Sequence, residues 1–189
     1  SYTGRYTTFI IPPANSVSSS YERTDEWDDL DTERLTAVLR QRTPESTVID
    51  NAAILPSEAA LVRKTAAYII RKRPDILTGW NADAFDVPYL LNRSFEIDDD
   101  PVIKDISPTR NIQRQEQKSH YVNEDLNGVH IIDTKAAYEK STYTSLKKST
   151  LDYVASKETD MEKLDVDEQK TWFTDPIEFA RYNIRDVSA

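Results

Sequence analysis

Apolar and polar positions along this chain form short blocks whose spacing changes from strand-like to helix-like. Residues 6–11 are β-branched and aromatic and stop at two prolines, which predicts a strand. Residues 15–29 are polar, with many serines and acids, and predict a surface loop. A helix that ends near Thr43 is expected next, because four apolar residues share one face: Leu30, Leu35, Val38 and Leu39.

The middle of the chain repeats this alternation with clear start and stop signals. Residues 47–49 predict a short strand, and Ser57 is placed to cap a helix that runs to Arg73. Pro74 ends that helix, and the apolar residues 76–80 predict the next strand. After Asp86, a proline in the first turn marks a new helix.

The pattern is lost over residues 96–127, which we interpret as a loop or hairpin insertion. It returns as a strand at 129–132, followed by helices near Ala136, at 149–156 and at 166–173. The last helix is expected to begin at Asp175-Pro176, an acidic cap followed by proline. Strands that alternate with helices indicate the α/β class.

Composition adds a size, a setting and a charge. The 189 residues suit one domain, residues 1–189, and the absence of cysteine suits the cytoplasm. No apolar run is long enough to span a bilayer, so no membrane partner is expected. The net charge of -9 favours a halophilic host whose salt screens an acidic surface, with an ordinary acidic domain as the alternative. If the ligand were a nucleic acid, metal ions would have to offset its repulsion by this acidic chain in either case.

The string from Asn81 to Asp86 is the first candidate for chemistry. It follows a predicted strand and precedes a predicted helix, where open α/β sheets usually bind their ligands. We expect Phe85 to anchor the turn by burial and Asp86 to point outward, while Asn81 bonds the turn backbone or a phosphate. A plain turn in which Asp86 only caps the next helix is the alternative.

The second candidate lies in the last helix, where Tyr182 and Asp186 are one turn apart. That spacing can place a phenol beside a carboxylate, although a solvent-exposed pair on a surface helix is the common case. We expect the buried stripe of this helix to contain Ile177, Ala180, Ile184 and Val187. Asp133, at the end of a strand, is better explained as the cap of the helix that follows.

Both strings lie within longer stretches that resemble family B DNA polymerases. Residues 74–81 with 85–90 are similar to the second exonuclease motif of that family, and residues 175–187 are similar to the third. Residues 128–133 and 149–155 resemble the segments between these motifs, in the same order. The resemblance implies that this chain has a ribonuclease-H-like fold, in which a mixed sheet is flanked by helices.

The resemblance implies a proofreading 3′→5′ exonuclease that acts on the single-stranded 3′ end of DNA with two Mg²⁺ or Mn²⁺ ions. Asp86 and Asp186 match the family's metal-binding aspartates, and Tyr182 matches the tyrosine that orients the water and the scissile phosphate. Asn81 and Phe85 would shape the substrate site. The other domains of the polymerase are the implied partners, and the acidic composition suggests an archaeal or haloviral source.

The family's first motif, Asp-x-Glu at the end of the leading strand, is not found. Asp31-Thr32-Glu33 fits the letters, but the residues before it are too polar for a buried strand. We therefore expect a fragment that lacks the central leading strand, binds metal weakly and is inactive by itself. Its uncovered sheet surface predicts self-association. A non-catalytic DNA-binding or scaffolding module and a stand-alone exonuclease remain alternatives.

Overall fold

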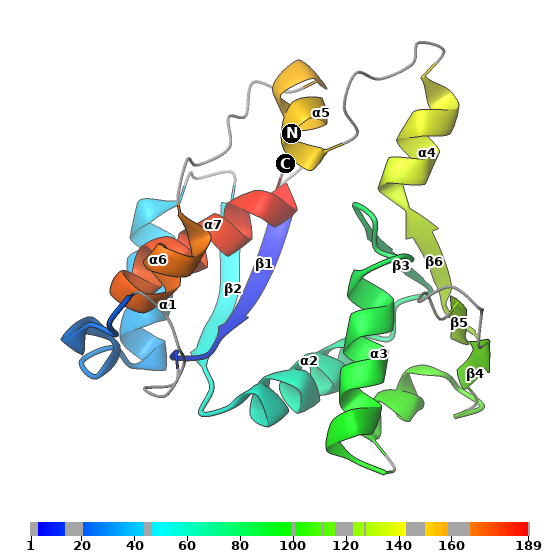
Figure 1. Cartoon of the computed structure of the whole chain (residues 1–189), viewed down its shortest axis with the longest axis horizontal. Helices are drawn as coiled ribbons and strands as arrows, with labels where there is room; N and C mark the ends of the chain where they lie inside the picture. The colour runs from blue at the N-terminus through cyan, green and yellow to red at the C-terminus, as the bar shows by residue number, and fades with distance from the viewer. Residues whose placement is uncertain are drawn as a thin grey trace. The chain divides into compact units, whose positions relative to one another are not determined.

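The computed structural model describes residues 4–13, 21–43, 47–99, 101–110, 112–115, 123–126, 128–142, 150–158 and 167–188. The chain divides into two compact units, one of residues 1–61 and 155–189 and the other of residues 62–154. Each unit combines helices with a parallel pair of strands, which confirms the α/β class (Figure 1).

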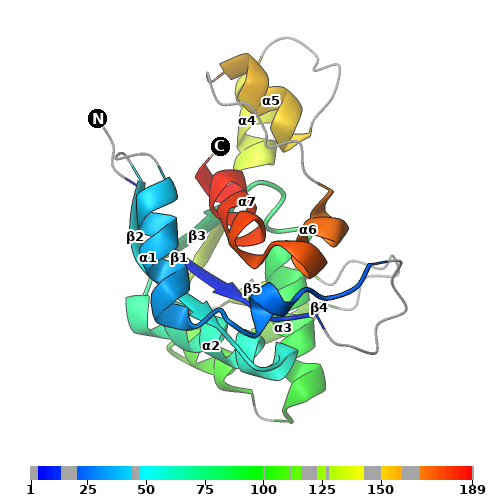
Figure 2. The ribbon, with the colours of Figure 1, turned by 90° about the vertical axis from the view of Figure 1, so that its left-hand side faces the viewer.

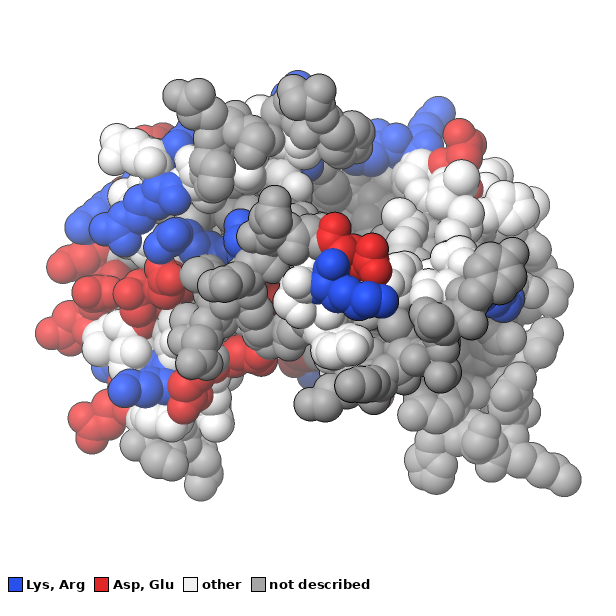
Figure 3. All heavy atoms as spheres, turned by 90° about the horizontal axis from the view of Figure 1, so that it is seen from above, with Lys and Arg blue, Asp and Glu red and all other residues white. Residues whose placement is uncertain are grey.

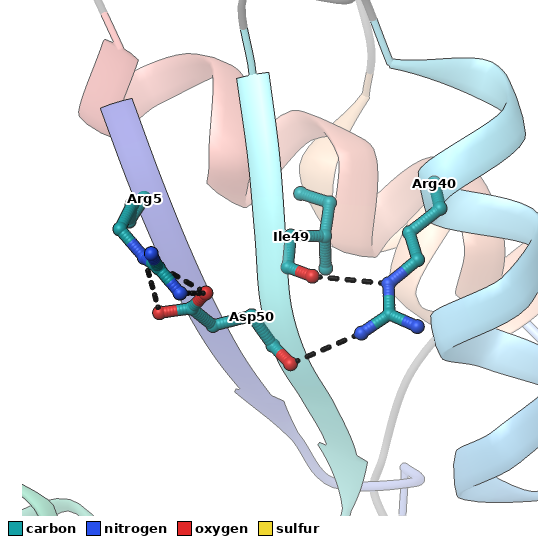
Figure 4. Close-up of polar contacts among 4 residues, drawn as sticks. All are labelled: Arg5, Arg40, Ile49 and Asp50. Atoms are coloured by element: carbon teal, nitrogen blue, oxygen red, sulfur yellow. Dashed lines mark hydrogen bonds and ion pairs between the residues drawn. The ribbon is translucent and has the colours of Figure 1, made fainter. Parts of the chain in front are cut away.

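The first unit is built around strands β1 (Gly4–Ile10) and β2 (Thr47–Ile54), which pair in parallel. The register shifts between Tyr6 and Thr7, so β2 has one extra residue, Asp50, at this point. Beside the bulge, the Arg5 guanidinium makes two-pronged contact with the Asp50 carboxylate, with Nη2 2.6 Å from Oδ1 (Figure 4). Arg40 binds the other side of β2 by donating from Nε to the Ile49 carbonyl at 3.0 Å and from Nη2 to the Asp50 carbonyl at 3.2 Å. The irregular point of the sheet is therefore held by side chains on both sides.

Helices α1 (Thr32–Arg42) and α7 (Pro176–Ser188) lie beside these strands (Figures 1 and 2). They contribute to one apolar core, which buries Ile10, Trp27, Leu30, Leu35, Leu39, Ile49, Ala52, Ala180 and Ile184. Helix α6 (Glu168–Thr174) packs against α7, and α5 (Leu151–Glu158) crosses the boundary between the units.

The segment expected to be a surface loop is partly core, and that prediction was wrong at its end. Residues Asp25–Trp27 form the short 3-10 helix η1, and Trp27 is only 3% exposed. Its Nε1 donates to the Trp172 carbonyl at 2.9 Å, while Trp172 Nε1 donates to the Ile11 carbonyl at 2.8 Å. A single tryptophan in a polar stretch has no periodic pattern, so its burial cannot be seen in the sequence.

The second unit contains β3 (Ile76–Gly79) and β6 (His130–Asp133), which pair in parallel with Gly79 opposite Asp133. One face of this pair packs on the core through Leu77 and Ile131. On the other face, Ile76 is 51% exposed and Ile132 is 44% exposed. A parallel pair normally has both faces covered, so this apolar surface is unusual.

The remaining elements complete the second unit. They are α2 (Glu58–Lys72), which begins in the first unit, α3 (Asp86–Ile97), η2 (Val102–Ile106), β4 (Ile112–Gln115), β5 (Asn123–Leu126) and α4 (Thr134–Ser141). Strands β4 and β5 form an antiparallel pair. The core of this unit buries Ala66, Leu91, Ile103, Ile106, Leu126 and Val129.

Most predicted helix starts and stops are confirmed. Ser57 Oγ accepts from the Ala60 amide at 3.2 Å, and Asp175 Oδ1 accepts from the Glu178 amide at 2.8 Å. The buried stripe of α7 was predicted wrongly at one position, because Val187 is 77% exposed. It lies one residue before the end of the described chain, beyond the core formed with β1 and α1.

Candidate active site

The string from Asn81 to Asp86 forms a tight turn between β3 and α3. Asn81 has a φ of 65°, in the left-handed region that asparagine tolerates, and its carbonyl accepts from the Phe85 amide at 3.0 Å. Ala82 is buried against β3, where a Cβ on Gly79 would lie 3.2 Å from the Ala82 Cβ. Small residues at these two positions let the turn fold back over the strand end. The predicted place of the string, after a strand and before a helix, is confirmed.

Asp133 joins this turn to the end of the neighbouring strand. Its Oδ1 accepts from the Asn81 amide at 3.1 Å, and also from the amides of Lys135 at 2.8 Å and Ala136 at 3.2 Å. The last two bonds cap α4, as predicted for Asp133. The bond to Asn81, 52 residues away in the chain, was not predicted.

Three carboxyl groups lie near one another at the carboxyl ends of β3 and β6. A hydrogen bond to Asp133 is the main reason why the pKa of Asp83 is raised, with burial and the Asp133 charge adding to it. Burial would raise the pKa of Asp133, but the bond from Asp83 and the backbone amides of Ala136, Asn81 and Lys135 outweigh it and lower that pKa. Asp83 is therefore the partner that tends to stay protonated, and its carboxyl group donates the hydrogen bond to Asp133.

Asp86 is the first residue of α3 and has an exposed side chain. Nearby protein atoms still displace part of its hydration, and this raises its pKa; the negative charge of Asp133 acts in the same direction. Its own backbone amide has the opposite effect. A cation beside Asp86 would remove this cost of ionisation, so the carboxylate is suited to metal binding.

Phe85 does not anchor the turn by burial, and that prediction was wrong. Its side chain is 63% exposed and stacks on Tyr89, which is 55% exposed, with ring centroids 6.2 Å apart and planes 14° apart. The buried residue of the turn is Ala82, because the left-handed Asn81 turns the chain so that position 82 faces the strand. The aromatic pair thus presents π surface next to Asp86.

In α7, Tyr182 and Asp186 are one turn apart, as predicted, but Tyr182 is only 6% exposed. Its hydroxyl donates to Glu168 Oε1 in α6 at 2.5 Å. The hydroxyl has one proton, and the bond to Glu168 uses it. While that bond is formed, the hydroxyl can contact a water only by accepting a hydrogen bond from it. A phosphate oxygen cannot donate, and contact with one would require the bond to Glu168 to break.

The predicted residues fall in different units. Asn81, Phe85 and Asp86 belong to the second unit, whereas Tyr182 and Asp186 belong to the first. The convergence of Asp86 and Asp186 therefore stays a prediction. Within the described ranges, no three His, Cys, Asp or Glu side chains are arranged to hold one metal ion.

Sequence reasoning missed Asp83 and Glu168. Asp83 had a visible signal, because it lies three residues before Asp86 in the same string. Glu168 had none, since its contact with Tyr182 joins two helices across a separation of 14 residues.

An α/β fold with carboxylates at the carboxyl ends of parallel strands is a common framework for enzymes that bind ligands at this edge of the sheet. Comparison with known families shows which class this chain belongs to. A sequence model of DNA polymerase family B, exonuclease domain, matches residues 23–154. The match covers more than half of the chain, so the chain belongs to this family, and the resemblance seen in the motifs is confirmed.

Two phage enzymes are similar over nearly the whole chain. The chain is 29% identical over 180 residues to the DNA-directed DNA polymerase of Enterobacteria phage T4, covering 92% of this chain and 20% of that polymerase. It is 29% identical over 178 residues to the DNA-directed DNA polymerase of Escherichia phage RB69, covering 90% and 20%. The chain thus spans about a fifth of the length of these curated relatives. The archaeal, salt-adapted source stays a prediction.

The surface of the described residues is mixed in charge. On the face in Figure 3, lysine and arginine side chains lie next to aspartate and glutamate side chains. None of the described helices has the length and apolar character that crossing a bilayer requires.

Proposed function

We propose that this chain forms the 3′→5′ proofreading exonuclease part of a DNA polymerase. The observation that carries the proposal is the group of carboxylates at the carboxyl ends of β3 and β6, with Asp86 at the start of α3. In α/β proteins this edge of a parallel sheet is the usual ligand site.

Divalent metal ions fit the chemistry of these donors, because Mg²⁺ and Mn²⁺ prefer carboxylate oxygens. Asp86 and Asp186 would hold them, and a bound pair would activate water and stabilise the leaving 3′ oxygen. Tyr182 would orient the attacking water by accepting a hydrogen bond from it, because the Tyr182 hydroxyl already donates its own hydrogen bond to Glu168. Asn81 would fix the turn, and Phe85 would contact the substrate.

The proposed substrate is the single-stranded 3′ end of DNA. The exposed rings of Phe85 and Tyr89 offer stacking surface that any base can use, which suits an enzyme without sequence preference. The net charge of -9 means that metal ions must offset repulsion by the phosphates. The cytoplasm and the remaining domains of a polymerase are the proposed setting and partners.

By itself the chain is proposed to be inactive and to self-associate through the exposed face of β3 and β6. Ile76 and Ile132 on that face are the residues that a second copy would cover. Light scattering of Ile132→Ser at high protein concentration should show fewer dimers than the wild type, with Val102→Ser as a control from outside the sheet. Equal dimer fractions in all three proteins would refute this contact.

The nuclease proposal is tested in the longest natural polypeptide that contains this sequence, by digestion of 5′-labelled single-stranded DNA with Mg²⁺. Asp86→Ala and Asp186→Ala should each reduce the rate by orders of magnitude, and Tyr182→Phe by less, since it removes no charge. Asp31→Ala, which removes only the cap of α1, is the control and should cut normally. If both aspartate variants keep their activity, the assigned metal site is wrong. DNA binding without cutting by the wild type would instead favour a non-catalytic module.

Convergence of the two aspartates has its own measurement. The chain contains no cysteine, so spin labels can be placed on single introduced cysteines at Tyr89 and Val187, which are exposed neighbours of Asp86 and Asp186. A short and narrow distance distribution is expected. A long or broad one would show that the two aspartates do not share a cation.

A further inference from the structure

Asp133 makes more contacts than the cap of a short helix requires. A capping carboxylate normally accepts from one or two amides of its own helix, and Asp133 does so with Lys135 and Ala136. The same oxygen, Oδ1, also accepts from the Asn81 amide at 3.1 Å. This third bond reaches the turn that carries Phe85 and Asp86.

The turn needs such a support. Asn81 adopts a φ of 65°, which costs energy for any residue with a side chain. Its carbonyl is used within the turn by the Phe85 amide, whereas its amide is used by Asp133. Asp133 is 9% exposed, so water competes poorly for this bond.

The parallel pairing fixes the position of Asp133 independently of the turn. It is the last residue of β6 and lies opposite Gly79, the last residue of β3. The turn begins directly after Gly79, so Asp133 is held by the sheet at the point where the turn must start. Its other neighbour is Asp83, which binds the same carboxyl group.

We infer that Asp133 is a positioning residue of the proposed nuclease site: its Oδ1 holds the Asn81 turn and thereby sets the place and direction of Asp86. Asp133 does not touch the reacting atoms in this role. The effect on Asp86 as a metal ligand rests on the proposed function. The hydrogen bond from the Asn81 amide to Asp133, called the clamp below, can be measured without any assay of activity.

Hydrogen exchange at single amides of the 189-residue chain separates the clamp from the cap. Asp133→Ser keeps a capping oxygen for α4 on a shorter side chain, so Lys135 and Ala136 should stay protected while the Asn81 amide exchanges at least about tenfold faster. Asp133→Asn keeps the acceptor oxygen, and its amide group can donate to Asp83. This variant should restore protection at all three amides to near the wild-type level.

Asp31→Ala serves as the control, because the Asp31 carboxylate caps α1 by accepting from the Arg34 amide. It should leave Asn81 unchanged. If Asp133→Ser leaves Asn81 fully protected, or if Asp133→Asn exposes Asn81 as much as serine does, Oδ1 is not what holds the turn and the inference is overturned. Asp133→Asn has nearly the shape of the wild type, so the comparison survives even if the serine variant folds poorly.

A titration with Mn²⁺, followed by the broadening of amide signals, tests the proposed metal site separately from the clamp. In the wild type, Mn²⁺ should broaden the amide signal of Asp86, and Asp133→Ser should need at least about tenfold more Mn²⁺ for the same broadening. No broadening in the wild type would contradict the metal site while the exchange data still decide the clamp. Equal broadening in both proteins, with Asn81 exposed in the serine variant, would show that the turn does not set the place of Asp86.

Discussion

The hydrogen bond between Tyr182 and Glu168 allows the sharpest test of the structure, because one residue proposed for catalysis is tied to one that no motif indicates. The Tyr182 hydroxyl is in a side chain only 6% exposed, and it lies 2.5 Å from Glu168 Oε1. A bond from a hydroxyl to an ionised carboxylate contributes about 1.5–3 kcal/mol when both partners are shielded. Glu168 is exposed, so solvent reduces the expected coupling to about 1 kcal/mol.

A double-mutant cycle of Tyr182→Phe and Glu168→Ala measures this coupling directly. Unfolding in urea can be followed by the fluorescence of Trp27 and Trp172, which both lie in the first unit, after Trp80 of the second unit is replaced by Phe. With a slope of about 1–2 kcal/mol per molar urea, a coupling of about 1 kcal/mol corresponds to about 0.5–1 M in the midpoint.

The matched control is the contact of Tyr21 with Asp167, which has the same chemistry at 2.9 Å on the neighbouring residue of the chain. Both partners there are accessible to solvent, so the coupling of Tyr21→Phe with Asp167→Ala should be clearly smaller. If the effects of Tyr182→Phe and Glu168→Ala simply add, to within about 0.3 kcal/mol, the bond to Glu168 is not formed in solution and does not stop Tyr182 from donating to a phosphate.

Three further outcomes are expected. Leu39→Ala removes a fully buried side chain from the first core and should lower the free energy of unfolding by about 2–5 kcal/mol; a change below about 1 kcal/mol in urea melts followed by Trp172 would contradict that packing. Arg63 lowers the pKa of Asp98 through a two-pronged bond, so the stability this pair adds is present above about pH 4 and is lost as the pH falls through the lowered pKa. The stability difference between wild type and Arg63→Gln should therefore shrink on acidification, and a difference that grows instead would show that the sign is wrong. Phe85→Leu should change stability by less than about 0.5 kcal/mol but weaken binding of single-stranded DNA by about 1–3 kcal/mol, and a fluorescence titration with unchanged affinity would exclude stacking on this ring.

The parts of the fold that were predictable are those with local causes. A capping side chain followed by an apolar stripe gave correct helix starts at Ser57 and Asp175, since both act within three residues. The start of α3 was also correct from a local signal, the proline in its first turn, although its N-cap residue Phe85 makes no side-chain capping bond. The strand before it, β3, ends at Gly79, one residue earlier than predicted. By contrast, β4 and β5 contain few apolar residues, and their pairing depends on contact between two segments that have no strand pattern of their own.

The candidate site divides in the same way. The resemblance of the motifs indicated Asp86, Asp186 and Tyr182 as candidates, but it could not show that Phe85 is exposed or that Ala82 takes the buried position. That outcome depends on one backbone angle at Asn81, which in turn depends on a bond to Asp133 on another strand. Contacts between distant segments leave no period in a sequence, so they have to be seen in three dimensions.

The proposed site has one half in each unit, and these contacts preorganise the side chains of each half before any metal binds. In the second unit, the sheet holds Asp133, and Asp133 holds the turn that ends at Asp86. In the first unit, Glu168 fixes the ring of Tyr182 one turn from Asp186 on the same helix. Each half is thus ordered by its own neighbours, and its stability should respond only to changes within its unit. If Asp86 and Asp186 hold the metal ions together, as proposed, catalysis should behave differently, because it would then need both aspartates at once. Losing Asp86 or Asp186 should therefore cost nearly as much activity as losing both, while their effects on stability simply add.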